Sequence, residues 1–304
     1  MYIADFFKKM TRKSNIPVLI YLVLNVFVIG FILQVFFEND GSTPYWKTFL
    51  IGLVLYGISL MIALSPIGEW ILRVQLGCKK IRRVEQINFL DPIFREVYEK
   101  AKQLEPAIPD DVKLFISEDE IPNAFATGRK TICITKGLLH APENQIKAVL
   151  GHEFGHLAHK DTDLILVVTV GNFIITAIIT LFKIIINIIT IILSFTSDGI
   201  KGVIAGMLTM IFVDGLMWVW SKIGTVLVMK SSRSNEFEAD EFSFNLGYGN
   251  ALCALLDSFD HSGAKGLFVT LVSSHPDNDD RIARLQELGA SYRASYGNNI
   301  SGKR

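Results

Sequence analysis

Four long stretches of apolar residues dominate the hydrophobic pattern of the chain. They occupy residues 16–37, 49–72, 164–195 and 203–229. The hydrocarbon core of a bilayer is about 30 Å thick, and a helix needs about 20 residues to cross it. Such a stretch can also be a buried core helix or, near the N-terminus, a signal peptide. No small-residue cleavage pattern follows the first stretch, however. We therefore predict four transmembrane helices.

The third and fourth stretches form a predicted transmembrane hairpin that contains two charged residues. Lys183 and Asp214 lie at similar distances along the chain from the turn near Asp198, hence at similar depth. Charges within a membrane usually pair or face a water-filled cavity. These two are therefore expected either to pair or to be solvated separately. At 1.5 Å rise per residue the third stretch would run for about 48 Å, so its helix is expected to tilt or to extend beyond the bilayer.

Basic residues flank the apolar stretches asymmetrically. Several precede the first stretch and several follow the second, whereas the loop between these stretches contains one, Lys47. Short loops rich in Lys and Arg stay in the cytoplasm. The N-terminus and the long polar segments are therefore predicted to be cytoplasmic. The flanking basic residues are Lys8, Lys9, Arg12, Lys13, Arg73, Lys79, Lys80, Arg82 and Arg83.

This topology predicts four regions along the chain. Residues 1–74 contain two transmembrane helices, and residues 163–229 form the transmembrane hairpin. Residues 75–162 and 230–304 are the two parts of one cytoplasmic domain, because together they have roughly the size of a single domain. The expected fold is a mainly α integral membrane protein whose cytoplasmic domain is split by the hairpin.

Composition excludes several classes of protein. The chain has 30 basic and 30 acidic residues and a formal net charge of zero, so no global charge favours nucleic acid. Half of the residues are hydrophobic, which excludes a disordered chain. The three cysteines, Cys78, Cys133 and Cys253, form no CxxC pair. The sequence therefore encodes neither a disulfide framework nor a thiolate zinc site.

The sequence His152-Glu153-Phe154-Gly155-His156 is an HExxH motif on a predicted helix. The helix is expected to begin at Pro142-Glu143, with the proline in its first turn. Residues four apart share a helical face, so both imidazoles can bind one metal ion. Glu153 lies beside them and can take a proton from water at that ion. The alternative is a pair of solvated surface histidines.

A catalytic zinc ion usually has three protein ligands and an open position. His159 shares the helical face of the motif but lies nearly one turn further along. Glu236 and Asp240 lie four residues apart on a helix predicted to begin within residues 232–235 and to end at Gly247. Glu236 can be the third ligand, and Asp240 can accept the remaining ring N–H of a ligating histidine. Alternatively, these residues are an acidic first turn favoured by the helix dipole.

These motifs resemble the HtpX-type membrane zinc metallopeptidases, which are gluzincins related to the CAAX prenyl proteases. The resemblance depends on HEFGH, the following Asp161, and SRSNEFEAD after the hairpin, and it extends over nearly the whole chain. It implies zinc ligands His152, His156 and Glu236, with Glu153 as the general base. It also implies that Asp240 contacts a ligating histidine, and that the cytoplasmic domain is α-rich and zincin-like with a small β-sheet.

Two further segments match the family. Residues 121–128 resemble the strand that precedes the active helix, and residues 112–117 and 131–135 are also predicted strands. An edge strand can align an extended substrate, and Asn123 is then a candidate contact with the substrate backbone or oxyanion; alternatively it is a turn residue. His275-Pro276 resembles a late family segment, in which His275 can stabilise the tetrahedral intermediate or simply cap a helix. The family more often has proline where Asp277 stands.

The resulting expectation is a zinc-dependent endopeptidase, with one Zn²⁺ per chain, in a bacterial-type cell inner membrane. By resemblance, it cleaves misfolded or damaged membrane proteins on the cytoplasmic side as part of quality control and the stress response. Its partners are polypeptide substrates and the lipid bilayer, without nucleic acid. The alternatives are a CAAX-type processing peptidase, a metal transporter and a non-proteolytic zinc scaffold. CAAX-type relatives have more spans, and transporters bind ions within their spans.

Overall fold

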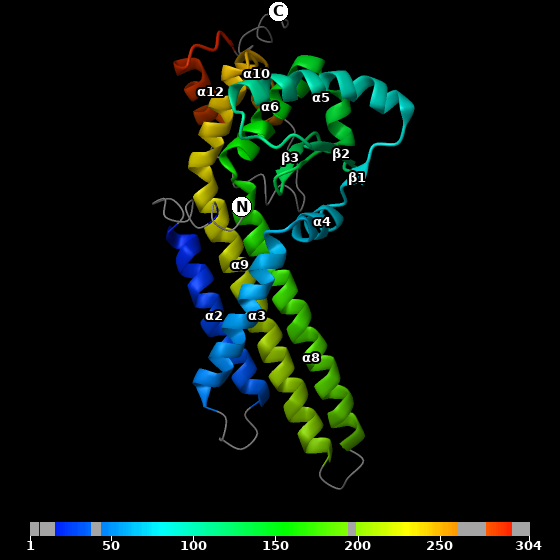
Figure 1. Cartoon of the computed structure of the whole chain (residues 1–304), viewed down its shortest axis with the longest axis vertical. Coiled ribbons are helices and arrows are strands. Elements are labelled where there is room, and N and C mark those ends of the chain that lie inside the picture. Colours follow the sequence, from blue (N-terminus) through cyan, green and yellow to red (C-terminus); the bar gives the residue numbers. More distant parts are fainter. Residues whose placement is uncertain (1–5, 7–15, 38–43, 194–198, 261–277, 294–304) are drawn as a thin grey trace, which may run out of the picture. The chain divides into compact units, whose positions relative to one another are not determined.

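The computed structural model describes residues 6, 16–37, 44–193, 199–260 and 278–293, with some helical side chains left out. The chain divides into two compact units. Unit 1 consists of residues 1–71 and 164–231, and unit 2 consists of residues 72–163 and 232–304 (Figure 1). The described residues are mainly helical with one small sheet, so the predicted fold class is confirmed at this level.

Unit 1 is built from long apolar helices. They are α2 (Ile16–Phe37), α3 (Tyr45–Ala63), the π-helical segment η3 (Leu166–Gly171), α8 (Asn172–Leu193) and the first part of α9 (Gly199–Asn245). Among the described residues, α3 is the one single helix long and apolar enough to cross a membrane. The helical segments before and after residues 160–161 pass the same test only if they are taken together as one bent span. The apolar part of α2 runs over residues 18–34. Four spans therefore remain a prediction.

A group of neutral polar side chains lies inside unit 1, and we call it the polar cluster. Asn25 is at its centre: its Nδ2 donates to Tyr56 Oη at 2.8 Å and to Asn172 Oδ1 at 3.2 Å. Asn172 Nδ2 donates to Tyr21 Oη at 2.7 Å, and Trp220 Nε1 donates to Asn25 Oδ1. The Tyr21 and Trp220 rings also stack, with centroids 5.1 Å apart. The cluster thus joins four helices within apolar surroundings, where such bonds fix helix register.

Unit 2 contains a four-stranded sheet in the order β1-β2-β4-β3. The strands are β1 (Lys79–Lys80), β2 (Lys113–Ser117), β3 (Ala124–Thr127) and β4 (Thr131–Thr135). β2 and β4 are parallel, with Ile116 opposite Ile134, and the other pairs are antiparallel. Gly128, at a φ of 62°, makes the tight turn between β3 and β4. The three predicted strands are confirmed, and β3 is an edge strand.

Helical segments share a hydrophobic core with this sheet in unit 2. They are α5 (Val84–Leu104), the 3₁₀ turn η2 (Lys136–His140), α6 (Glu143–His159), the end of α9, α10 (Gly249–Asp260) and α12 (Asn278–Glu287). Contacts join α6 to α5, to α10 and to β3. The shared core includes Ile134 of the sheet, Val97 of α5 and Phe154 of α6, each almost completely buried. α6, which carries the HExxH motif, is therefore held in the interior of its unit.

Two predicted helix starts differ from the structure. α9 is continuous from Gly199 to Asn245, so no new helix begins within residues 232–235. The polar residues there favour a helix cap, but neither Gly nor Pro interrupts residues 225–246, and the helix continues. Its predicted end is confirmed, because Gly247 has a φ of 91°. Pro142 is the N-cap of α6 rather than a residue of its first turn, with an extended ψ of 144°.

Two short helices connect the units along the chain. α4 (Pro66–Gln75) follows α3, and α7 (Thr162–Ile165) follows α6. α4 is strongly amphipathic: Ile67, Trp70 and Val74 recur at helical spacing and are each more than half exposed. Lys183, one of the two charges predicted to pair in the hairpin, has a side chain outside the described part of the structure.

Candidate metal centre

Helix α6 directs two imidazoles from the same face. His152 and His156 are four residues apart, and their Nε2 atoms lie 3.1 Å from each other. Glu236 of α9 extends its carboxylate to the same point, with Oε2 3.4 Å from His152 Nε2 and Oε1 3.3 Å from His156 Nε2. Each of the three residues offers a ligand atom, and these atoms all lie within 4.8 Å of one another. The structure thus brings together the three predicted metal ligands.

The other nitrogen of each imidazole contacts a carboxylate. His152 Nδ1 lies 2.8 Å from Asp240 Oδ1, and His156 Nδ1 lies 3.1 Å from Asp161 Oδ2. A neutral imidazole that donates its Nδ1 proton has its lone pair on Nε2. Two nitrogen lone pairs and the Glu236 oxygens then face one another, and they repel unless a cation lies between them. The donor set fits a zinc ion, which binds imidazole nitrogen and carboxylate oxygen.

Burial and charge act in opposite directions on these imidazoles. Burial alone lowers the pKa of His152, but the contacts with Asp240 and Glu236 outweigh burial and raise the pKa above its ordinary value. Burial likewise lowers the pKa of His156. The negative charge of Glu236 and the hydrogen bond with Asp161 outweigh burial and raise the pKa well above its ordinary value. The surroundings of both rings therefore favour positive charge, which a bound divalent cation can supply in place of protons.

Arg281 of α12 is a further member of this group, and it belongs to the late family-like segment but has no role predicted from the sequence. Its Nε donates to Asp240 Oδ2 at 2.7 Å and its Nη2 donates to Asp240 Oδ1 at 2.6 Å, while Nη1 lies 3.9 Å from Glu236 Oε2. Burial raises the pKa of Asp240, but the Arg281 guanidinium outweighs burial and holds the pKa below its ordinary value. Arg281 thus keeps Asp240 ionised and oriented towards His152.

Glu153 points towards the edge strand β3. The backbone N–H of Ala126 donates to Glu153 Oε2 at 2.6 Å, and the side chain of Glu153 is buried. Its other oxygen, Oε1, has no hydrogen-bond partner among the described residues. This arrangement fixes the carboxylate through one oxygen and leaves the second oxygen available to exchange a proton.

Three consecutive residues after α6 hold the centre against the β3–β4 turn. Lys160 ends the helix in the left-handed conformation, with a φ of 58°, and the next residue, Asp161, turns back to contact His156. Thr162 Oγ1 donates to the carbonyl of Gly128. Asp163 forms a buried, bidentate ion pair with Arg129, at 3.0 and 2.5 Å. These contacts attach the end of α6 to the β3–β4 turn. They therefore fix the position of the His156 imidazole relative to the edge strand β3.

Small residues allow α6 and the end of α9 to approach closely. A Cβ atom added at Gly155 would lie 2.8 Å from the Cα of Ala239, a distance that ordinary packing does not allow. About two turns earlier on α6, the carbonyl of Ala148 accepts a hydrogen bond from Ser243 Oγ at 2.8 Å. The spacing between the helices is therefore set by Gly155, and this spacing allows Glu236 to reach the histidines.

The other residues named from the sequence have different positions. His159 lies edge-on to the ring of Phe242 and does not belong to the converging group, which favours Glu236 over His159 as third ligand. Asn123 directly precedes β3, and its Oδ1 accepts from the backbone N–H of Ala124 at 2.9 Å. His275 lies outside the described residues.

Comparison with known proteins places this site in a family. The profile of peptidase family M48 matches residues 90–289, a segment that includes the histidines, both carboxylates of α9 and Arg281. The chain belongs to peptidase family M48. The predicted resemblance to HtpX-type peptidases and the predicted enzyme class, a metallopeptidase that hydrolyses peptide bonds, are confirmed by this membership together with the relatives below.

Relatives named HtpX match nearly the whole chain. Protease HtpX of Alcanivorax borkumensis is 28% identical over 305 residues, covering 90% of this chain and 96% of the relative. Protease HtpX of Hahella chejuensis is 27% identical over 300 residues, covering 88% of this chain and 98% of the relative. Other matches are partial: the match with the HtpX homolog of Thermoplasma acidophilum, at 33% identity over 141 residues, spans 43% of that relative. The matches thus span nearly the full length of two relatives named HtpX and less than half of the Thermoplasma acidophilum homolog.

Among solved structures, the chain is similar to the crystal structure of Ste24p from S. mikatae. The match covers 90% of this chain and 67% of that chain, with 19% sequence identity and a TM-score of 0.44.

Proposed function

We propose that the protein is a zinc-dependent endopeptidase of the cell inner membrane that cleaves misfolded or damaged membrane proteins on the cytoplasmic side. The catalytic domain consists of residues 75–162 and 230–304, and residues 1–74 and 163–229 provide four transmembrane helices. The four apolar stretches within these regions and the basic residues that flank them support this topology. Membership of the M48 family supports polypeptide substrates.

The observation that supports this function most strongly is the convergence of two imidazole nitrogens and a carboxylate beside the free oxygen of Glu153. In this proposal His152, His156 and Glu236 bind one zinc ion, and Asp240 and Asp161 orient the two imidazoles. Zinc bound there supplies a Lewis acid that polarises the substrate carbonyl and lowers the pKa of water. Glu153 is then the residue of this chain that moves protons.

Glu153 acts as the general base and later as the general acid. Its Oε2 is held by the Ala126 N–H, so Oε1 accepts the proton of the attacking water. The same oxygen returns the proton to the leaving amine nitrogen when the peptide bond breaks. Because the carboxylate is buried and fixed at one oxygen, little reorganisation accompanies these transfers.

The edge strand β3 is suited to position an extended substrate. Asn123 and Glu153 accept hydrogen bonds from the N–H groups of Ala124 and Ala126, two amides that face away from β4 in the alternation of an antiparallel pair. A substrate strand added at this edge would donate main-chain hydrogen bonds to the carbonyl groups that face the same way as these amides. Such binding would depend little on the substrate's own sequence. We propose that Asn123 contacts the substrate backbone there and that His275 stabilises the tetrahedral intermediate.

The test compares the wild type, Glu153→Gln and a matched control, Glu143→Gln, as full chains in detergent. Glu143 begins the same helix, is exposed and pairs with Lys147 at 2.7 Å, and it is not among the residues of the metal centre. We expect all three proteins to retain about one zinc per chain, and casein cleavage to fall by about 10²–10⁴-fold in Glu153→Gln alone. If all bind zinc and none cleaves, the protein is a zinc scaffold. If Glu153→Gln cleaves as fast as the wild type, the base is a different residue.

A further inference from the structure

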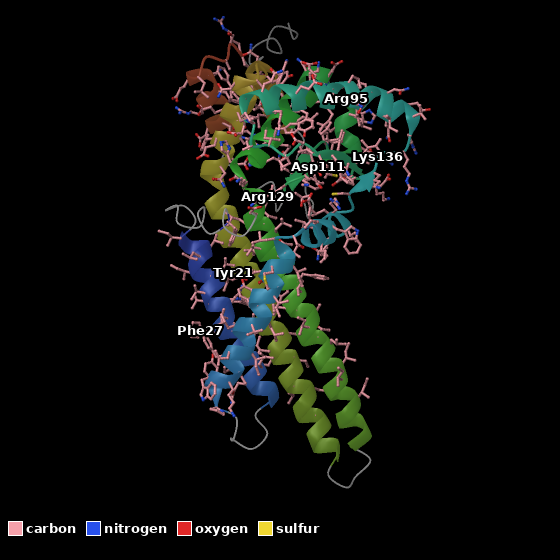
Figure 2. All side chains as sticks on the ribbon, in the orientation of Figure 1. Tyr21, Phe27, Arg95, Asp111, Arg129 and Lys136 are labelled. Carbon is pink, nitrogen blue, oxygen red and sulfur yellow. The ribbon has the colours of Figure 1, made fainter. Side chains whose placement is uncertain are left out.

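A cleft of about 370 Å³ lies at the β1 edge of unit 2, away from the residues of the metal centre. Five basic residues and one acidic residue contribute to its walls. They are Lys79, Lys80, Arg82, Arg83, Lys136 and Glu118. We call this hollow the basic cleft; Lys136, one of its lining residues, is labelled in Figure 2.

The positive charges of the basic cleft are not balanced. Glu118 is shared by two of them, because its Oε1 lies 3.4 Å from Lys79 Nζ and its Oε2 contacts Lys136 Nζ. Lys80, Arg82 and Arg83 have no carboxylate within ion-pairing distance among the described residues. The cleft also adjoins the first turn of α5, whose N-cap residue Arg83 makes no side-chain capping bond. The acidic residue of that turn, Glu85, does not line the cleft. An anion of more than one charge would relieve this repulsion.

A second hollow, of about 400 Å³, shares Lys80 with the basic cleft. Its walls are mostly apolar side chains of α5 and of the strand edge. We call it the apolar groove; its lining includes Ile81, Ile87, Leu90, Phe94 and Phe115. A ligand that places a negative group in the basic cleft therefore finds an apolar surface directly beside it, on the other side of Lys80.

The chain context of these two hollows identifies the class of ligand. They follow α4, which presents Ile67, Trp70 and Val74 on one exposed face and which directly succeeds the apolar helix α3. Amphipathic helices with exposed aromatic and aliphatic residues lie in the headgroup region of membranes. Basic clusters next to a transmembrane helix attract anionic lipids.

We propose that the basic cleft binds the phosphate of an anionic phospholipid, with the apolar groove receiving the first carbons of an acyl chain. Lys80 lies at the junction. Arg82 and Arg83 supply positive charge that favours an anionic lipid over a zwitterionic one, whose own cation offsets its phosphate. This inference requires membrane attachment but not peptidase activity, so it can fail or succeed independently of the proposed function.

The test uses the full chain, delipidated in neutral detergent, and measures binding by native mass spectrometry. The probes are dihexanoyl-phosphatidylglycerol, dihexanoyl-phosphatidylcholine and inorganic phosphate. The cleft variant combines Lys80→Gln, Arg82→Gln and Arg83→Gln. The control variant removes three exposed cations outside both hollows, Arg95→Gln, Lys130→Gln and Arg284→Gln, each of which has its own carboxylate partner. A single change, Ile87→Asp, tests the apolar groove.

We expect saturable binding of phosphatidylglycerol to the wild type and the control variant, and binding roughly tenfold to a hundredfold weaker in the cleft variant. Ile87→Asp is expected to weaken phosphatidylglycerol binding severalfold and inorganic phosphate binding less, because only the lipid also loses the apolar contact. Equal affinity of the wild type and the cleft variant would overturn the proposal. Inorganic phosphate binding as tightly as the lipid, or phosphatidylcholine binding as tightly as phosphatidylglycerol, would also overturn it.

Discussion

Each unit of the chain contains a buried group of polar side chains, and the two groups differ in kind. The polar cluster of unit 1 consists of amides, hydroxyls and an indole, and its hydrogen bonds each join a donor to an acceptor. The metal centre of unit 2 consists of imidazoles, carboxylates and a guanidinium, and the Nε2 atoms of His152 and His156 face each other and Glu236. The neutral group is complete by itself, whereas the charged group is complete only with a cation.

This difference indicates that the neutral polar cluster stabilises the packing of helices, whereas the charged metal centre is built to bind an ion. Neutral groups that are fully hydrogen-bonded fix the packing of helices at little cost. Buried charges cost several kcal/mol in desolvation and are poor stabilisers, so their retention points to a function. In unit 2 the charged residues contact one another in series: Asp240 orients the His152 imidazole, and Arg281 in turn orients Asp240.

The largest effect is expected from removing the outermost charge of the metal centre. Arg281→Met leaves Asp240 buried without its ion-pair partner, which should cost about 3–5 kcal/mol of unfolding free energy. Zinc affinity should also fall about 10–100-fold, because His152 is no longer held. Thermal unfolding and zinc titration in detergent measure both effects. The control is Arg284→Met, one turn along α12 and exposed, and equal behaviour of the two variants would contradict the assignment of Arg281.

A packing change tests whether helix spacing sets the geometry of the centre. Gly155→Ala introduces a Cβ atom too close to Ala239, and we expect a loss of about 1–3 kcal/mol together with weaker zinc binding. Gly57→Ala is the control, because no atom lies within 4 Å of a Cβ added there, and it should be neutral or stabilising. Unchanged zinc affinity in Gly155→Ala would show that Glu236 does not depend on this contact.

A change in the polar cluster should affect stability and leave the metal alone. Asn25→Leu removes the residue that bonds Tyr56, Asn172 and Trp220, and bonds of this kind between apolar helices contribute about 0.5–2 kcal/mol. The thermal midpoint should fall while zinc affinity stays the same. Asn88→Leu, an exposed position of α5, is the control for the change of side chain. A loss of zinc affinity in Asn25→Leu would contradict the separation of the two groups.

The smallest expected effect concerns an exposed ion-pair network of unit 2. Hydrogen bonds from Lys147 and Lys100 lower the pKa of Glu96 to about 2. The stability that Glu96 provides is therefore present above the pKa of an unfolded glutamate, about 4.3, and is lost as the pH falls towards 2. Because Glu96 is 41% exposed, Glu96→Gln should cost less than about 1 kcal/mol at pH 7. Thermal unfolding should show this difference shrinking between pH 5 and pH 3; a constant difference would exclude the network as its source.

Local patterns predicted the local part of the site. The HExxH spacing predicts two imidazoles on one helical face, and the spacing of Glu236 and Asp240 predicts one carboxylate towards the metal and one behind it. The structure has this geometry. The role of Arg281 was not predicted, because an ion pair with a residue 41 positions away leaves no periodic signal. The same reason applies to Arg129 and Asp163, which are 34 positions apart.

Helix boundaries were less predictable than helix content. The serines and asparagine of residues 231–235 favour a cap, but packing and the absence of Gly or Pro carry α9 through them. Pro142 suits the first turn of a helix, yet its extended ψ places it one position earlier, as the N-cap. The two-residue strand β1 is too short for any alternation of polar and apolar residues to be seen in the sequence.

The central claim is that two imidazoles and one carboxylate converge to bind zinc, and zinc K-edge X-ray absorption of the full chain in detergent tests it most directly. With one zinc per chain, the account predicts two imidazole ligands at about 2.0–2.1 Å, oxygen in the remaining positions and no sulfur. Glu236→Gln should change the oxygen shell and preserve both imidazoles. A sulfur ligand, or a spectrum with fewer than two imidazoles, would contradict the account.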